Sequence, residues 1–379
     1  MIFNETEYNT SWSTKKLIEL GDFSRGKSRH RPRNDKKLFN NGKYPLIQTG
    51  DIKSSNLYVK KHSSEYNDFG LKQSKMWDEG TLCITIAANI AESGILAYPM
   101  CFPDSIVGFT ANKNECSELF MYYVFEYIKN SVKSSASGSI QDNINIDYLS
   151  NLEFKIPSLK YQGKIVEILK NIDEKINNNE DIIEEINNMA ITTYNFKILQ
   201  KVKNNANIDN LKIFKISDLV DVVTGKEDAN FASPNGKYPF FTCSNEILKC
   251  DEFKFNGKAV LLTGNGELNI KYYSGKFNAY QRTYVLIPKE EKYVGLIYHA
   301  LLNKLNTLKK GSNGSIVKFI TKDDVSDTKI YVPSNNNEIE SFNKYLNTID
   351  QLQKENRYLY EIKNYILPLL MNGQIKIED

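Results

Sequence analysis

The chain contains one ordered series of short motifs twice, once in each half. The pentapeptide Asn-Gly-Lys-Tyr-Pro stands at 41–45 and returns letter for letter at 235–239. Later motifs of the first half return at a constant offset of 176 positions: Gly138-Ser139-Ile140, Asp147, Ser150 and Pro157-Ser158. A collinear series of this kind predicts the same elements in the same order in each half. The unit is too long for a solenoid or propeller, whose repeats run roughly 20 to 50 residues, so we expect two similar domains in tandem.

Length and composition fit this organisation. The 379 residues leave room for two domains of ~100 to 200 residues and connecting helices. There is no run of about 18 apolar residues, and the first residues lack the basic and apolar regions of a signal peptide. We therefore expect a cytoplasmic protein without a membrane span. Five scattered cysteines without a Cys-x-x-Cys pair, and three histidines without metal spacing, predict no disulfide framework, no metal site and no cofactor.

Both halves alternate short apolar runs with turn residues, a pattern typical of strands between loops. In the first half these runs are LIELGDF, YPLIQTGDI, GTLCITIAANIAESGILAYP and SIVGFTA, which begin at residues 17, 44, 80 and 105. The segments 119–130 and 294–305 are apolar on most sides and predict buried helices. We predict an α+β protein with two mixed α/β domains, at 1–158 and 207–334, and two helical regions, at 159–206 and 335–379.

The two helical regions carry mostly apolar residues at alternating steps of three and four, the spacing that holds one stripe against a partner helix. The stripes are related by an offset of 177 positions. Each helix could run ~30 to 40 residues, or roughly 45 to 60 Å. We therefore predict a coiled-coil seam made of these residues: Ile165, Ile168, Ile172, Lys175, Asn179, Ile182, Ile186, Met189, Thr193 and Phe196, and Phe342, Tyr345, Ile349, Leu352, Asn356, Leu359, Lys363, Ile366 and Leu370.

Asn179 and Asn356 occupy equivalent interior positions of the two stripes. A buried asparagine costs stability unless its amide finds a partner, and its best-attested use in paired helices is to fix register and partner number. We expect these two residues to meet within one chain and to set the register of the helix pair. The alternative is that two asparagines coincide by chance in an asparagine-rich chain.

A basic strip lies at 25–37, with the sequence RGKSRHRPRNDKK. Seven basic residues stand here against one acidic residue, and four of the six arginines of the chain are among them. Such a strip binds anions. Taken alone it could be a solvated loop, but its place inside a repeated domain favours a nucleic-acid surface.

No catalytic motif is present. The sequence lacks a Walker loop, a Gly-x-Ser-x-Gly elbow, a methyl-donor loop and the Asn/Asp-Pro-Pro-aromatic segment that holds a flipped base. The lone Gly264-Asn265-Gly266 is more typical of a turn after a strand. We therefore predict no catalytic residue and a recognition protein with two heads and a helical spacer.

The order of motifs resembles the specificity subunit of Type I restriction-modification systems. The resemblance is carried by Leu20-Gly21-Asp22, by the Gly-Lys with its basic loop, by the segment 42–52 (GKYPLIQTGDI), by the Ile-Pro before a long helix, and by the return of the whole set. The ending ILPLLMNG at 366–373 is similar to the close of the second spacer helix in that family.

This resemblance implies a protein without catalysis of its own, with two target recognition domains separated by two long antiparallel helices in a pseudo-twofold arrangement. It implies binding of double-stranded DNA at a split, asymmetric site whose gap the helices set. It also implies two methyltransferase subunits as partners and, in the larger complex, motor-nuclease subunits. Half-sites on one face of DNA lie about one helical turn, ~34 to 36 Å, or a multiple of it apart.

Candidate DNA-binding residues follow from charge and side-chain type. For phosphate contacts we predict Arg25, Lys27, Arg29, Arg31, Arg33 and Lys36 in the first head, and Lys226, Lys271, Lys276, Arg282, Lys309 and Lys310 in the second. Base edges need bidentate or amide side chains, which favours Arg29, Arg31, Gln48, Gln281 and Arg282, with Tyr280 stacking. Because the second head carries the acidic loop EDANFASPN where the first is basic, we expect unlike half-sites and no palindrome.

Three alternatives stay open from the residues alone. One is the specificity subunit of a related system in which a fused methylase-nuclease chain replaces separate subunits. Another is a duplicated glycan- or protein-binding scaffold, in which the many tyrosines and phenylalanines stack on the ligand. The third is an enzyme with unrecognised nuclease carboxylates.

Overall fold

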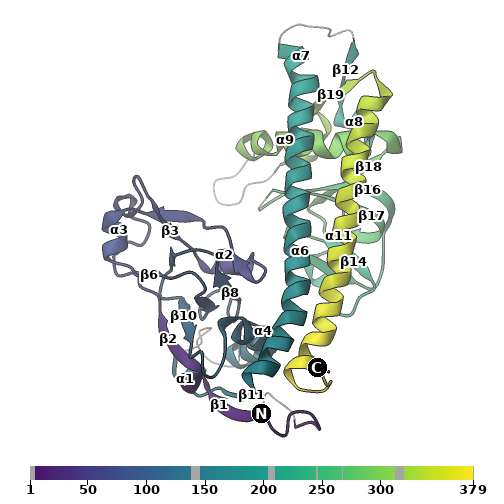
Figure 1. Cartoon of the computed structure of the whole chain (residues 1–379). Helices are drawn as coiled ribbons and strands as arrows, with labels where there is room; N and C mark the ends of the chain where they lie inside the picture. Colours follow the sequence, from purple (N-terminus) through teal and green to yellow (C-terminus); the bar gives the residue numbers. More distant parts are fainter. Residues whose placement is uncertain are drawn as a thin grey trace. The chain divides into compact units, whose positions relative to one another are not determined.

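The chain folds into two compact units in the computed structural model (Figure 1). The structure describes residues 5–137, 146–203, 210–244, 246–266, 268–311 and 320–378. Unit 1 comprises Met1–Asn177 with Tyr358–Asp379, and unit 2 comprises Asn178–Arg357. The two recurring Gly-Ser-Ile motifs, at 138–140 and 314–316, lie outside the described residues.

Unit 1 is built from three small sheets. A two-stranded antiparallel sheet joins β1 (Ser13–Lys16) to β11 (Glu153–Ile156). The five-stranded sheet has the order β2 (Gly21–Arg25), β10 (Ile106–Ala111), β7 (Leu82–Thr85), β8 (Ser93–Leu96) and β4 (Tyr58–Val59). The four-stranded sheet has the order β5 (Ser64–Tyr66), β3 (Tyr44–Leu46), β9 (Met100–Cys101) and β6 (Met76–Trp77).

Unit 2 repeats this plan with longer strands. Its two-stranded sheet joins β12 (Leu211–Lys215) to β19 (Lys329–Pro333). Its six-stranded sheet has the order β13 (Val220–Thr224), β18 (Thr283–Pro288), β16 (Phe255–Thr263), β17 (Ile270–Ala279), β14 (Tyr238–Phe241) and β15 (Ile247–Cys250). The first four strands of this sheet follow the order of their unit 1 counterparts β2, β10, β7 and β8. The predicted fold class, with two similar bodies of mixed α and β structure, is confirmed.

Helices complete each unit. Unit 1 contains α1 (Leu17–Leu20), η1 (Lys36–Leu38), α2 (Thr49–Lys53), α3 (Asp68–Lys72), α4 (Glu118–Ser137) and α5 (Ile146–Ser150). Unit 2 contains α8 (Ile216–Leu219), η4 (Ala229–Phe231), η5 (Glu291–Tyr293), α9 (Val294–Gly311) and α10 (Lys322–Ser326). The buried helices predicted at 119–130 and 294–305 are confirmed as α4 and α9. Within the described ranges, no helix is long and apolar enough to cross a membrane.

The strand predicted to begin at residue 17 is wrong for its first four residues. They form the helical turn α1 because Glu19 caps it: the Lys16 backbone N–H donates to the Glu19 carboxylate at 2.7 Å. Unit 2 repeats the turn in α8, where the Lys215 N–H donates to Asp218 at 2.8 Å. A carboxylate that satisfies a free N–H at a helix start outweighs the apolar pattern.

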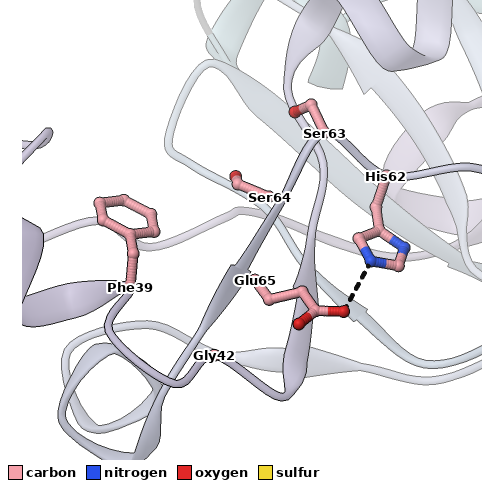
Figure 2. A pocket seen from close by; sticks show the side chains of 6 residues that line it. All are labelled: Phe39, Gly42, His62, Ser63, Ser64 and Glu65. Carbon is pink, nitrogen blue, oxygen red and sulfur yellow. Dashed lines mark hydrogen bonds and ion pairs between the residues drawn. The ribbon is translucent and has the colours of Figure 1, made fainter.

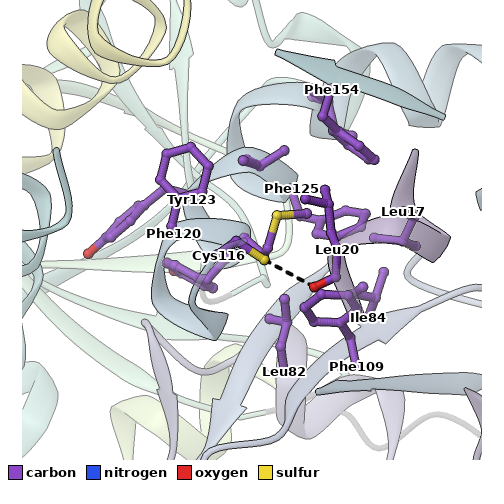
Figure 3. Packing of buried hydrophobic residues seen from close by; sticks show 14 of the residues in the cluster. Leu17, Leu20, Leu82, Ile84, Phe109, Cys116, Phe120, Tyr123, Phe125 and Phe154 are labelled. Atoms are coloured by element: carbon purple, nitrogen blue, oxygen red, sulfur yellow. Dashed lines mark hydrogen bonds between the residues drawn. The ribbon is translucent and has the colours of Figure 1, made fainter. Parts of the chain in front are cut away.

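The core of unit 1 lies between α4 and the five-stranded sheet (Figure 3). Phe120 and Tyr123 from α4 pack with Leu82 and Phe109 from the sheet, and all four side chains are buried. The nearby Cys116 thiol donates to the Leu20 carbonyl at 3.2 Å and joins the α1 turn to this core. Unit 2 has the corresponding core between α9 and its large sheet.

The repeated Asn-Gly-Lys-Tyr-Pro segment has a structural explanation in its glycine. A Cβ atom on Gly42 would collide with the carbonyl oxygen of Glu65, and one on Gly236 would collide with the backbone of Cys250. Each glycine therefore lets β3 or β14 lie close to the next strand. The motif recurs because both sheets need this close approach.

The long helices α6 (Leu159–Tyr194) and α11 (Asn336–Met371) each contain 36 residues and lie side by side (Figure 1). In unit 2, Asn179 contacts Asn356, and the ring of Tyr194 lies 6.1 Å from that of Phe342. Residue numbers thus rise along α6 while they fall along α11, so the helices are antiparallel. A π-helical segment (Asn195–Leu199) and α7 (Gln200–Lys203) extend α6.

The predicted seam is only partly correct on α6. Ile182, Met189 and Phe196 are 42, 55 and 67% exposed, whereas the neighbouring Ala190 and Tyr194 are buried. The prediction assumed a repeat of 3.5 residues per turn, whereas the face of a straight α-helix rotates by ~20° per heptad relative to that repeat. The residues that are buried therefore differ increasingly from the predicted seam towards the C-terminal end of α6. Lys175 is also exposed. The seam of α11 stays closer to the prediction, and this helix continues through Pro368 to Met371.

A buried ion pair joins the two helices in unit 1. The Lys363 ammonium of α11 lies 2.6 Å from the Asp173 carboxylate of α6, and the Tyr123 hydroxyl of α4 donates to the same carboxylate at 2.9 Å. Asp173 is fully buried and Lys363 is nearly so. The sequence analysis placed Lys363 in the seam but did not predict its partner Asp173. A buried lysine is rare unless it is paired, so the position of Lys363 was the available signal for this ion pair.

Replacing Lys363 by Met should destabilise the protein by about 3 to 5 kcal/mol, because Asp173 would keep a buried charge without its cation. Urea unfolding measures this loss. The double variant Lys363→Met with Asp173→Asn should recover a large part of it, since both charges are then gone. Equal losses in the single and double variants would contradict the ion-pair account.

His299 occupies the position in unit 2 that Tyr123 holds in unit 1, 176 residues earlier. Its side chain is fully buried in α9, and its Nδ1 lies 2.8 Å from the Gly295 carbonyl oxygen, so Nδ1 donates the hydrogen bond. Nε2 has no hydrogen-bond partner among the described residues. Burial lowers the pKa of His299 to about 4, so the imidazole is neutral at physiological pH.

This lowered pKa predicts acid sensitivity. The unfolded chain binds a proton at His299 near pH 6.5, whereas the folded chain does so only near pH 4. Stability present above pH 6.5 should therefore be lost as the pH falls towards 4, by up to about 3 kcal/mol. Urea unfolding across this range measures the slope. His299→Phe should flatten it, and an unchanged slope would exclude His299 as its source.

Candidate functional site

A Gly-Lys segment and a tight turn lie together at one edge of unit 1. Gly26 donates its N–H to the Ile106 carbonyl at 2.9 Å, and Lys27 donates to that of Phe102 at 3.1 Å. A Cβ on Gly26 would collide with the carbonyl oxygen of Phe102, so only glycine lets the basic loop approach the turn this closely. The start of the predicted basic strip is thereby tied to the turn at 102–105.

Two more loops contact this turn or the end of β9 directly before it. Ile86, at the start of the loop between β7 and β8, donates its N–H to the Ser105 carbonyl at 2.9 Å. Ile47, between β3 and α2, donates to the Cys101 carbonyl at 3.0 Å. We call the segments 25–36, 47–50, 86–92 and 102–105 the unit 1 edge.

Unit 2 assembles the same edge from its own residues. Gly225 donates to the Thr283 carbonyl at 3.1 Å, and a Cβ on it would collide with the Ala279 carbonyl oxygen. Gly264 donates to the Arg282 carbonyl at 2.7 Å, as Ile86 does to Ser105. We call the loops 225–231, 242–244, 264–266 with 268–269, and 279–282 the unit 2 edge.

The basic strip of the unit 1 edge contains both free and engaged side chains. Arg25, Lys27, Arg29 and Lys36 are exposed and make no side-chain hydrogen bond or ion pair with another described residue. Four cationic side chains are thus available to an external anion.

The other two predicted arginines of the strip bind within the chain. The Arg31 guanidinium donates to the carbonyls of Ser28 at 2.6 Å and His30 at 2.9 Å. The Arg33 Nη2 donates to both carboxylate oxygens of Asp104, at 2.8 and 3.0 Å. Both partners of this pair are well exposed, and such a surface pair is worth only about 0 to 1 kcal/mol, so a phosphate could compete for it.

Gln48 lies at the start of α2 in the unit 1 edge. Its backbone N–H donates to the Asp51 carboxylate at 2.6 Å, while its side chain is exposed. The capping role therefore belongs to Asp51 and to the backbone of Gln48, and it leaves the Gln48 amide available.

The predicted residues of the second head fall into three groups. Lys226, Tyr280, Gln281 and Arg282 lie together in the unit 2 edge, where Gln281 N–H donates to the Glu227 carbonyl at 2.9 Å. The Gln281 side-chain amide also donates to Asp228 at 2.6 Å. This group carries fewer cations than the unit 1 edge and includes two acidic neighbours.

Lys271 and Lys276 have partners within the chain. The Lys271 ammonium donates to the Ser244 carbonyl in the unit 2 edge. Burial lowers its pKa to about 8, so it stays mostly protonated at pH 7. Lys276 lies over the ring of Phe253 at 4.7 Å, outside the four loops. Lys309 and Lys310 end α9, but their side chains lie outside the described part of the chain.

A shallow pocket in unit 1 offers a competing site (Figure 2). It is lined by Phe39, Gly42, His62, Ser63, Ser64 and Glu65. Its polar groups are already engaged: His62 lies 3.2 Å from Glu65 and 2.7 Å from the Tyr98 hydroxyl, and Ser63 donates to Asp51 at 2.8 Å. The pocket adjoins the Asn-Gly-Lys-Tyr-Pro segment, which has a structural role, and the described side chains contain no cluster of three or more metal-ligand residues.

Sequence reasoning missed two loops of these edges, 86–92 and 264–266 with 268–269. In the sequence they lie within or after apolar runs that predict strands, and they contain no charge cluster. The available signal was the Gly-x-Gly at 264–266, for which we predicted a turn; the structure has a bend at Gly266, with a φ of 70°.

Comparison with known proteins gives one consistent result. The protein-family model described as "Type I restriction modification DNA specificity domain" matches residues 9–188 and 208–364. The Type I restriction enzyme EcoDI specificity subunit of Escherichia coli is 34% identical over 174 residues, which are 44% of this chain and 39% of that protein. The MjaIX specificity subunit of Methanocaldococcus jannaschii is 20% identical over an alignment covering 100% of this chain and 97% of that protein.

A solved structure shares the fold along the whole chain. The Type I restriction-modification system S subunit from M. genitalium superposes with a TM-score of 0.54 at 16% sequence identity, and the match covers 99% of both chains.

Proposed function

Because the chain belongs to the Type I restriction-modification DNA specificity family, we propose that it binds a double-stranded DNA site in two separate halves, one at each edge. It is a specificity subunit, the non-catalytic part of such an enzyme. The observation that carries the proposal is that both units build the same four-loop edge while the side chains presented there differ.

The phosphates of the first half-site would meet Arg25, Lys27, Arg29 and Lys36. These side chains are exposed at the unit 1 edge and have no competing partner among the described residues. In unit 2, Lys226 and Arg282 would take this role beside Glu227 and Asp228. Because phosphate contacts position DNA and base contacts specify it, the less basic unit 2 edge must depend more on the base edges, for which Gln281, Arg282 and Tyr280 are the candidates.

We propose the helix pair as the docking surface for two methyltransferase subunits. In unit 1, α11 exposes Tyr358, Ile362 and Tyr365, which are 66, 49 and 71% accessible. Steps of four and three place them on one helix face, as a partner helix would require. In unit 2, the exposed Ile182 and Met189 of α6 and Phe196 of the π-helical segment offer a second such face. Motor-nuclease subunits would join this assembly, and a DNA substrate favours a cytoplasmic location.

Mapping methylated bases in the genome of a host that expresses this chain with its methyltransferase subunit tests the proposal. We expect one split target, with two unlike short sequences separated by unread base pairs, and no such methylation in the host without this chain. A continuous or palindromic target would contradict it.

Salt dependence separates DNA recognition from a glycan- or protein-binding scaffold. The affinity of the purified complex for its target should fall steeply with salt, because each neutralised phosphate contributes about −0.9 to the slope of log K against log salt. A glycan or peptide ligand would be nearly insensitive. A flat salt response would favour the scaffold, and metal-dependent cutting by the isolated chain would favour an enzyme. A fused methylase-nuclease partner would appear as a single co-purifying chain.

The asparagine contact predicts a change in the gap of the target. Asn179 Nδ2 donates to Asn356 Oδ1 at 2.7 Å and to Glu355 at 2.8 Å, and both asparagines are buried. Replacing both with Leu should remove the polar pair that selects one helix register and broaden the gap lengths that the mapping experiment recovers. Asn347→Leu, on the exposed face of α11, is the matched control. An unaltered gap in the double variant would contradict the role of this asparagine pair in setting the helix register.

A further inference from the structure

The loops after β7 and β16 are built on equivalent threonines. Thr85 is fully buried, and its hydroxyl accepts the Glu92 N–H at 2.9 Å and donates to the Asn89 carbonyl. Thr263 is also buried, and its hydroxyl accepts the Asn269 N–H at 2.8 Å. In each unit one hydroxyl therefore closes the loop across its base.

Both loops hold their tips in left-handed backbone. Ala88 has a φ of 48° and Ala91 a φ of 60° in unit 1, and Gly266 has a φ of 70° in unit 2. An alanine in this region carries steric strain of order 1 kcal/mol or more that the surrounding contacts must hold. Strain of this kind is most often found where a chain must present a group in one defined position.

The two loops share the threonine that closes them, but they differ in the residues at their tips. The unit 1 loop presents Ala88 and Asn89, both exposed, whereas the unit 2 loop presents Asn265 and Gly266. The side-chain amides of Asn89 and Asn265 form no hydrogen bond with another described residue. Two copies of a domain that read unlike DNA sequences need a shared loop backbone with different tip residues. The backbone contacts can then stay the same while the residues that read the bases change.

We propose that the loop 86–92 and the loop residues 264–266 with 268–269 are base-reading elements, with Asn89 and Asn265 as the residues that contact base edges. An asparagine amide offers one donor and one acceptor side by side, which matches the N6 and N7 atoms of adenine in the major groove. Thr85 and Thr263 act as positioning residues, because they hold the loops without reaching the DNA. This inference rests on the proposed function, since it assigns specificity within the same edges.

The test compares recognition profiles of the complete complex with its methyltransferase subunit. Asn89→Ala should reduce discrimination at one base pair of the first half-site by roughly tenfold and leave the second half-site unchanged. Asn265→Ala should do the reverse. Asn114→Ala, an exposed asparagine outside the unit 1 edge, is the matched control and should change neither. Unaltered profiles in both variants, or a uniform loss of affinity without a change in base preference, would overturn the inference.

The threonines supply a second, independent readout. Thr85→Val keeps the side-chain volume but removes the hydroxyl, so it should relax the same base pair as Asn89→Ala. Thr85→Ser should restore the wild-type profile. A Thr85→Val variant that unfolds leaves the Asn89→Ala and Asn265→Ala profiles as the deciding result. If the wild-type complex recognises no split site, the proposed function itself fails; if it does and only the loop variants are silent, the loop assignment alone fails.

Discussion

The hydrogen bond between Asn179 and Asn356 joins two residues that hold the same position in their respective repeats. Two antiparallel copies of one helix must meet at such a self-equivalent point, and the two amides form their hydrogen bond in one register only. A slip by one helical turn would place each buried amide against apolar neighbours, at a cost of roughly 1 to 3 kcal/mol for each group left unpaired. The register of the long helices therefore depends on this contact more than on any single apolar residue of the seam.

The two edges show how duplication separates architecture from recognition. Both glycines that approach the tight turn, both threonines that close the loops and the backbone bonds that join them recur in the two units. Charges do not recur. The unit 1 edge presents four unengaged cationic side chains, whereas the cations of the unit 2 edge lie beside Glu227 and Asp228. A shared backbone frame with unlike side chains is what two heads need in order to read two different sequences.

Sequence reasoning succeeded where a signal extended over many residues and failed where one contact decided the conformation. The collinear repeat predicted two similar domains, and the regular spacing of apolar residues predicted both long helices. The α1 turn was missed because the capping bond from Lys16 to Glu19 is short-range and overrides an apolar run. The loop 86–92 was missed because Ala88 and Ala91 carry no mark of their left-handed backbone, which tertiary contacts impose. The basic strip was found, but its division into free residues and the engaged Arg31 and Arg33 depends on carbonyls and carboxylates that only the fold brings near.

The buried carboxylate of Asp173 shows how the two repeats diverged in the seam itself. Its equivalent, Asp350, is retained but is paired with Lys354 one turn along the same helix at 2.6 Å, while the position equivalent to Lys363 is Ile186. In unit 1 the ion pair thus ties α6 to α11, and in unit 2 it stays within α11. Losing one member of a buried pair costs more than replacing both, so Lys363 can be exchanged only together with Asp173. This dependence restricts change at the seam of unit 1. The loop tips that we propose as base-reading elements form no ion pair among the described residues, so each of them can change singly.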